Sequence, residues 1–130
     1  MYELKGYYED TDAGGVVYYA NYLKYFERAR TEYFAERGLV VSELAQKGIH
    51  FVVVRVEEDL RSPAVLGDII QVETALGEFG NASLWVNYVV KRKADGKVLV
   101  EGRSKLACIN DDFRVMKIPQ ELRDKLKAGQ

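Results

Sequence analysis

The apolar and polar residues divide the chain into one helical segment near its start and a series of β segments after it. Between residues 20 and 37, apolar side chains recur at intervals of four, three and four residues, at Tyr22, Phe26, Ala29 and Tyr33. This is the period of a helix with one buried face. The spacing therefore predicts one long amphipathic helix over residues 20–37.

The residues that flank this segment have the chemistry of helix ends. Asn21 suits the N-cap and Gly38 suits the C-terminal stop. A short helix is expected over residues 42–47, ending at Gly48, and a charged terminal helix follows Pro119.

From residue 50 onward the apolar period changes to two, which is typical of strands. Strands are predicted over residues 50–60, 69–76, 84–92 and 97–109, and a more polar first strand over residues 2–10. Asp95-Gly96 is the strongest hairpin signal, and a second turn is expected at residues 78–81. One helix covered by one antiparallel sheet of about five strands gives an α+β fold.

Composition limits the class of protein. A length of 130 residues predicts a single domain over residues 1–130. The 19 basic and 20 acidic residues argue against a nucleic-acid partner. No apolar run approaches the roughly 18 residues of a transmembrane segment, and the first ten residues are too polar for a signal peptide.

The single cysteine and the single histidine bear on compartment and metal binding. Cys108 has no internal partner for a disulfide, which favours a reducing cytoplasm, and its apolar strand predicts a packing role. Because the sequence has one cysteine and one histidine, His50, no His/Cys metal site is expected. His50 is interpreted as structural, because it stands at a strand start far from the motif described next.

The most distinctive stretch is residues 8–33, where Asp12 precedes Gly14 and Gly15 and a helix start. A carboxylate there lies close to free backbone N–H groups that can bind an anion, which suits acyl transfer or hydrolysis. The alternative is that Asp12 only shapes a turn through its side chain. The glycines can likewise allow close approach of a substrate or simply form the turn.

This stretch resembles a known signature. The run TDAGGVVY at residues 11–18, with Asn21-Tyr22 and Glu27-x-x-Arg30, is similar to the 4-hydroxybenzoyl-CoA thioesterase family, which has the hot-dog fold. Within it, the bacterial acyl-CoA thioesterases that accompany the Tol-Pal genes are most similar. The resemblance implies a curled sheet around the long helix, and a dimer, often doubled into a tetramer.

The resemblance also implies roles for individual residues. Asp12 is expected to be the catalytic carboxylate, either as the nucleophile on the thioester or as the base that activates water. The backbone N–H of Tyr19 is expected to stabilise the oxyanion. Several Tol-Pal-associated members carry His at the position of Tyr19, so the resemblance does not extend here to a proton-shuttling side chain at this position or to a short-acyl preference. Any non-proline residue still supplies the N–H donor.

Coenzyme A carries phosphates, and three consecutive cations could bind them. Lys91, Arg92 and Lys93 precede the Asp95-Gly96 hairpin and are the expected substrate-binding cations. The alternative is a solvated strand end, because short basic runs are common on surfaces.

The sequence thus predicts a cytoplasmic acyl- or aryl-CoA thioesterase that needs no metal or other cofactor. It is expected to form a homodimer, because a curled sheet leaves edges uncovered, and the resemblance implies that the dimer can be doubled into a homotetramer. One alternative is a non-catalytic protein of the same fold that binds acyl thioesters or acts as a dimeric scaffold. Another is a hydratase or dehydratase, which usually needs a catalytic histidine.

Overall fold

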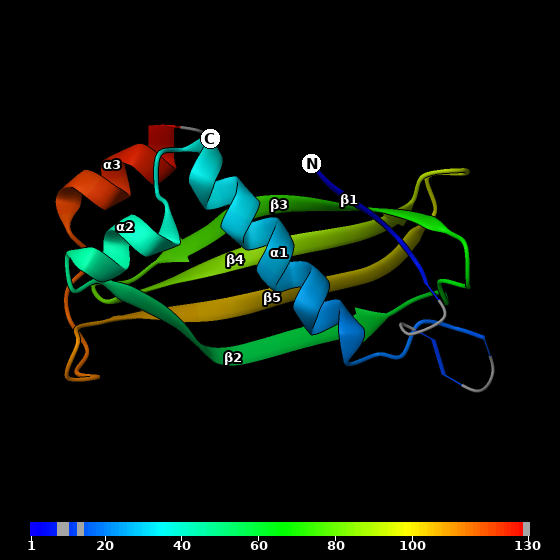
Figure 1. The fold of residues 1–130 in the computed structure, drawn as a ribbon, viewed down its shortest axis with the longest axis horizontal. Coiled ribbons are helices and arrows are strands. Elements are labelled where there is room, and N and C mark those ends of the chain that lie inside the picture. Colours follow the sequence, from blue (N-terminus) through cyan, green and yellow to red (C-terminus); the bar gives the residue numbers. More distant parts are fainter. Residues whose placement is uncertain (8–10, 13–14, 129–130) are drawn as a thin grey trace.

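A long helix lies across one face of a curled antiparallel sheet (Figure 1). The computed structural model describes residues 1–7, 11–12 and 15–128. Its elements follow the chain as β1 (Tyr2–Lys5), α1 (Asn21–Glu36), α2 (Val41–Gln46), β2 (His50–Leu60), β3 (Ile69–Phe79), β4 (Ser83–Arg92), β5 (Val98–Ile109) and α3 (Gln120–Ala128). Within the described residues the sheet has the order β1-β3-β4-β5-β2, with every neighbouring pair antiparallel.

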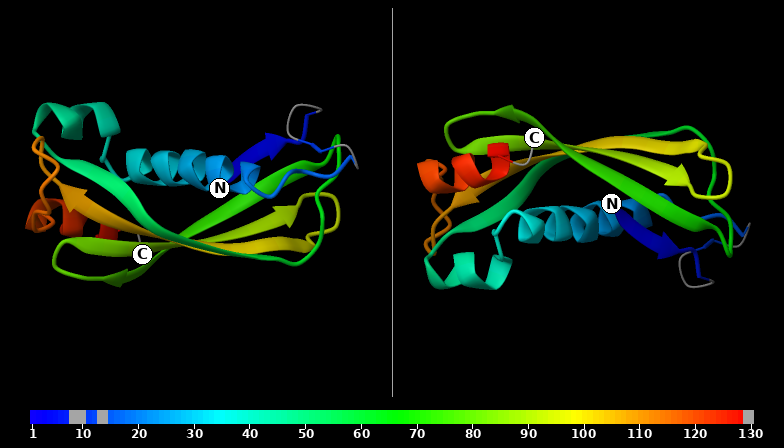
Figure 2. Two further views of the ribbon diagram at one scale, coloured as in Figure 1. Left: turned by 90° about the horizontal axis from the view of Figure 1, so that it is seen from below. Right: turned by 90° about the horizontal axis from the view of Figure 1, so that it is seen from above.

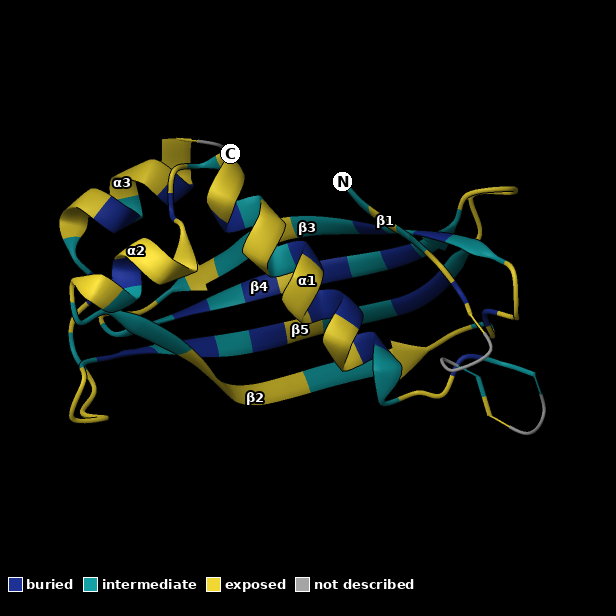
Figure 3. Ribbon diagram, in the orientation of Figure 1, coloured by how far each residue is buried: buried dark blue, intermediate teal, exposed yellow. Residues whose placement is uncertain are grey.

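The apolar stripe of α1 packs on the concave face of the sheet, as its spacing predicts. Its buried residues are Tyr22, Tyr25, Phe26, Ala29 and Phe34. They meet the alternate buried residues of β3 and β4, namely Ile70, Val72, Leu84, Val86, Tyr88 and Val90. Figure 2 shows the sheet curling past the helix, and Figure 3 shows the buried positions along β4 and β5 beneath α1. The expected hot-dog arrangement is confirmed.

The two ends of α1 differ in how well the sequence predicted them. Gly38 follows the helix at a φ of +82°, the left-handed conformation of a C-terminal stop. Asn21 is not the N-cap. The helix begins at Asn21, and Ala20 occupies the cap position in a helical conformation with no side-chain cap. A turn at residues 18–20 precedes the helix, and this moves the start one residue beyond the expected cap.

Most strand boundaries agree with the prediction, and two differ. β3 continues to Phe79, so the hairpin turn follows Phe79 and is closed by the N–H of Gly80 donating to Ser83 O. The first strand ends at Lys5, well short of residue 10, and residues 8–10 lie outside the described part of the chain. Gly6 no longer pairs with β3, the neighbour of β1. Its N–H donates to Asp68 O, and its carbonyl oxygen accepts the N–H of Gly67.

The short helices and the loops gather at opposite ends of the sheet. α2 and α3 lie at one end (Figures 1 and 2). The segment before α1, the β2–β3 connection and the β4–β5 hairpin lie at the other. No described helix is both long and apolar enough to cross a membrane.

Candidate active site

The backbone around Asp12 folds into a small hairpin. The N–H of Asp12 donates to Val16 O at 2.9 Å, and the N–H of Gly15 donates to Asp12 O at 3.0 Å. Thr11 and Val17 pair across its base. Gly15 has a φ of +79°, which glycine adopts without strain, so this glycine meets a conformational need of the turn.

The β2–β3 connection holds this hairpin from one side. The N–H of Val17 donates to Ala64 O at 2.8 Å, and the N–H of Leu66 donates to Gly15 O at 3.2 Å. Val16 and Val65 form the matching antiparallel bridge. The loop that carries Asp12 is therefore positioned by a segment about fifty residues later in the sequence.

The turn before α1 presents one backbone donor to the same region, the N–H of Tyr19. Tyr18 O accepts the N–H of Asn21, and Tyr19 O accepts the N–H of Tyr22, so the turn before the helix uses their carbonyl groups. No acceptor for the N–H of Tyr19 is found among the described residues. Such a group at a helix N-terminus is available to an anion, and the helix dipole favours negative charge there.

Asp12 and Tyr19 meet at one open hollow of about 470 Å³. Its lining comes from the loop, the helix start and the end of β2, and consists of Asp12, Val16, Val17, Tyr18, Tyr19, Tyr22, Leu60, Ser62 and Pro63. Among the described residues the lining is mostly apolar and aromatic, and Asp12 is its one carboxylate. This is the usual composition of a small-molecule site.

Three tyrosines form the aromatic part of this wall. The exposed rings of Tyr18 and Tyr19 lie 4.7 Å apart at an angle of 55°, and a hydrogen bond between their hydroxyls raises the pKa of Tyr18. Tyr22 is buried and its hydroxyl bonds to the backbone of Ala64. Burial raises the pKa of Tyr22, and the bond to Ala64 opposes that shift. Tyr22 therefore joins the helix to the β2–β3 connection.

Comparison with known proteins identifies the family. The model of the thioesterase-like superfamily matches residues 8–126. The chain belongs to the thioesterase-like superfamily. The acyl-CoA thioesterase YbgC of Haemophilus influenzae is 35% identical over 94% of this chain and 90% of its own length. The acyl-CoA thioester hydrolase YbgC of Escherichia coli is 33% identical over 82% of this chain and 79% of its own.

Solved structures agree with this assignment. A hypothetical protein from Thermus thermophilus superposes with a TM-score of 0.91 at 31% identity, covering 98% of this chain and 96% of that one. A gentisyl-coenzyme A thioesterase superposes with a TM-score of 0.87 at 29% identity, covering 96% of this chain and 98% of that one. The family predicted from residues 11–30 is thus confirmed.

In this thioesterase-like chain, only some of the predicted site residues come together. Asp12 and Tyr19 share the hollow, and Gly15 forms the turn beside it, whereas Gly14 lies outside the described residues. His50 hydrogen-bonds Asp111 at 2.7 Å and is not part of the described lining, in line with a structural role.

The three cations predicted to bind phosphate do not form one cluster. Lys91 and Lys93 pair with Glu73 and Glu3 at 3.0 and 3.1 Å. Arg92 follows the buried positions of β4 and so lies on the face that α1 covers, bound to carboxylates and a backbone carbonyl. A phosphate site at these residues stays a prediction.

The sequence did not indicate the lining from Leu60, Ser62 and Pro63. Leu60 ends β2 and the other two follow it, and the pairing of residues 15–17 with residues 64–66 brings them beside the loop of Asp12. Tyr18, Tyr19 and Tyr22 also line the hollow, and no pattern in the sequence distinguishes them from the other tyrosines.

Proposed function

We propose that this member of the superfamily hydrolyses an acyl- or aryl-CoA thioester to the free acid and coenzyme A. The observation that carries the proposal is that Asp12 and Tyr19 border one hollow and that the N–H of Tyr19 has no acceptor among the described residues. A thioester carbonyl between them would meet a carboxylate on one side and a hydrogen-bond donor on the other. The names of the relatives support the same reaction class.

Two routes use this arrangement. In the first, an Asp12 oxygen forms a bond to the acyl carbon, the C–S bond breaks, and the thiolate leaves. Water then hydrolyses the mixed anhydride and restores the carboxylate. In the second, Asp12 takes a proton from a water molecule as that water attacks the same carbon. The C–S bond then breaks, and the departing thiolate takes the proton, which restores the carboxylate. The N–H of Tyr19 stabilises the oxyanion in either route, and the proposal requires no metal or redox cofactor.

The wall of the hollow suits an apolar or aromatic acyl group. Tyr18, Tyr22, Leu60 and Pro63 supply rings and aliphatic carbon beside Asp12. One similar structure is a gentisyl-coenzyme A thioesterase, whose acyl group is aromatic. We therefore include aryl-CoA compounds among the substrates to be tested.

The uncovered edge of β2 supports the proposal of a homodimer. β2 ends the sheet, and its valines and Leu60 are exposed; Val53 is 47% exposed and Leu60 is 56% exposed. Beside them an open groove of about 440 Å³ separates β2 from α1. An apolar edge strand with an open groove favours pairing with a second copy. A tetramer would need a further surface in addition to this one.

Thiol release is the direct test of the function. The purified chain is incubated with acetyl-, butyryl-, palmitoyl- and benzoyl-CoA, and the coenzyme A thiol is followed with a thiol reagent. Release from at least one substrate, saturating with concentration, is expected. Binding without release from any of them would support the non-catalytic alternative.

A further inference from the structure

Arg92 occupies an unusual place for a residue in a basic run. It lies at the end of β4 on the face that α1 covers, and its side chain is only 21% exposed, compared with 56% for Lys93. Each of its nitrogens has an acceptor. Nε donates to Asp68 at 3.1 Å, Nη1 donates to Asp95 at 3.0 Å, and Nη2 donates to Pro63 O at 3.1 Å.

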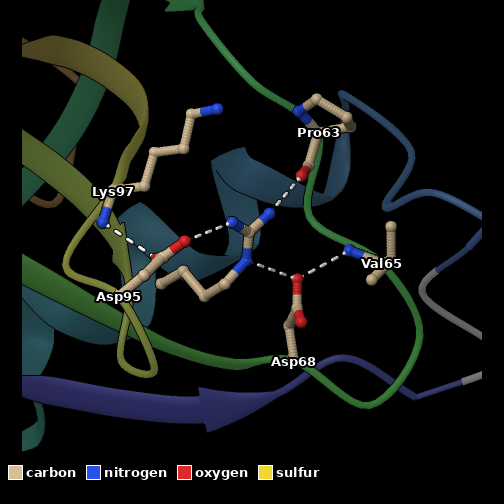
Figure 4. A network of polar contacts seen from close by, with 6 residues as sticks. Pro63, Val65, Asp68, Asp95 and Lys97 are labelled. Carbon is tan, nitrogen blue, oxygen red and sulfur yellow. Dashed lines mark hydrogen bonds and ion pairs between the residues drawn. The ribbon is translucent and has the colours of Figure 1, made fainter.

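These contacts join three parts of the chain at the site end of the molecule. Figure 4 shows Asp68 and Pro63 from the β2–β3 connection facing Asp95 from the β4–β5 hairpin, with the guanidinium between them. Asp68 also accepts the N–H of Val65 at 3.0 Å. The connection is thus held at Pro63, Val65 and Asp68.

The same connection carries the candidate active site. Ala64 bonds to Val17 of the Asp12 loop and to the hydroxyl of Tyr22 in the first turn of α1. The residue that holds this connection therefore influences the loop and the helix start together. Pro63 itself lines the hollow, so Arg92 hydrogen-bonds directly to a residue of the site.

We propose that Arg92 is a positioning residue of the thioesterase site, which holds the 63–68 connection so that Asp12 stays in register with the N-terminus of α1. This inference rests on the proposed function. In this proposal Arg92 acts through the connection, because each of its three nitrogens already donates one hydrogen bond within the chain. Asp68 and then Asp95 raise the pKa of Arg92, as expected for a cation bound to two carboxylates.

The neighbouring lysines provide matched controls for the hydrogen-exchange measurement, whereas kcat is compared with wild type, because Lys91 and Lys93 are themselves predicted substrate contacts. Lys91 and Lys93 each pair with a single glutamate, and neither has a hydrogen bond to the 63–68 connection among the described residues. Their loss removes an ion pair at the same end of the sheet without releasing the connection. Exposed ion pairs of this kind contribute about 0–1 kcal/mol to stability.

The test compares Arg92→Met with Lys91→Met and Lys93→Met in the full chain. We expect Arg92→Met to lower kcat by about tenfold to a hundredfold with KM changed by less than about threefold, because a small displacement of a reacting group is costly. Amide hydrogen exchange at Val17 and Leu66 should become faster in this variant alone. Arg92→Lys keeps the charge but not the forked geometry, so we expect an intermediate kcat.

The outcomes separate this inference from the function on which it rests. Unchanged kcat in Arg92→Met, with exchange at Val17 and Leu66 equal to that of the lysine variants, would overturn the positioning role. If wild type hydrolyses no thioester, the proposed function fails, and the exchange rates still test whether Arg92 holds the connection. If Arg92→Met does not fold, Arg92→Lys and Asp95→Asn supply the same comparison.

Discussion

The ring of Phe26 on α1 lies flat against the ring of Tyr88 in β4, with centroids 4.3 Å apart and an interplanar angle of 6°. Arg30, one helical turn later, donates to the hydroxyl of the same Tyr88 at 3.1 Å. The helix is therefore fixed to the centre of the sheet by two adjacent contacts. This packing fixes the helix whose first turn follows Tyr19.

Gly102 in β5 makes room for that packing. A Cβ at this position would lie 2.6 Å from Phe26 Cζ and 3.0 Å from the carbonyl oxygen of Glu57. We predict that Gly102→Ala lowers the free energy of unfolding by about 1–3 kcal/mol, the usual cost of overpacking a core. Urea unfolding measures this change.

Two further variants control for the general effect of replacing glycine. Gly80→Ala, in an exposed turn, meets mainly the small side chain of Ser83 and should change stability by about 0.5 kcal/mol or less. The pair Gly102→Ala with Phe26→Leu should cost less than the sum of the two single changes. Strict additivity would show that the contact with Phe26 is not the cause.

Adjacent glutamates in β2 should give opposite pH dependences of stability. Oε2 of Glu58 is buried without a partner among the described residues, and burial raises the pKa of Glu58 above its ordinary value of 4.5. Burial penalises the charged carboxylate, so the folded protein loses stability as pH rises from about 4.5, and the loss levels off once Glu58 is fully charged. The free energy of unfolding, measured with urea between pH 4 and 8, should rise for Glu58→Gln relative to wild type as pH increases.

Glu57 is the matched comparison on the opposite face of the strand. Its hydrogen bond to Arg103 holds the pKa of Glu57 below the ordinary value of 4.5. The stabilisation is present above pH 4.5 and is lost as pH falls through the lowered pKa. Glu57→Gln should therefore be less stable than wild type at neutral pH and equal to it in acid. The same sign for both variants would contradict this account of the two environments.

The exposed edge of β2 predicts how the proposed dimer can be separated. Val53 lies on this edge beside the groove against α1. Val53→Lys places a charge in the proposed interface, and we expect it to shift the protein from dimer to monomer in sedimentation velocity at micromolar concentration. Val115→Lys, at an exposed site outside that strand, should leave the dimer intact. A dimer that persists in Val53→Lys would place the interface elsewhere.

The role given to Tyr19 depends on its backbone rather than its side chain. Tyr19→Ala keeps the N–H and should lower kcat by less than about tenfold. Tyr19→Pro removes the N–H and should lower kcat by about a hundredfold to a thousandfold, the usual effect of losing an oxyanion donor. Circular dichroism checks that α1 still forms in both. Equal losses in the two variants would assign the effect to the tyrosine ring.

The sequence predicted most of the fold because period and turn chemistry are local. The spacing of Tyr22, Phe26 and Ala29 located α1, and Gly38 and Gly96 marked chain reversals at positive φ. The prediction of Asn21 as the N-cap was wrong because residues 18–20 form a turn before the helix. No pattern in the sequence distinguishes that turn from a cap.

The sequence predicted only those site residues that lie close together along the chain. Asp12 and Tyr19 are seven positions apart, so one motif contained both. The contribution of Pro63 and the role of Arg92 depend on long-range pairing between the 63–68 connection, the Asp12 loop and the β4–β5 hairpin. Three consecutive basic residues suggested one phosphate site, but the alternation of a strand sends Arg92 to the opposite face from Lys91.

The central claim is that the carboxylate of Asp12 carries out thioester hydrolysis. The most direct measurement is the rate of thiol release by Asp12→Asn, compared with wild type on the best substrate of the panel, with unfolding curves recorded for both. The account predicts that kcat falls by about a hundredfold or more while stability changes little, because the amide can neither attack nor accept a proton. Turnover close to that of wild type in Asp12→Asn would contradict it.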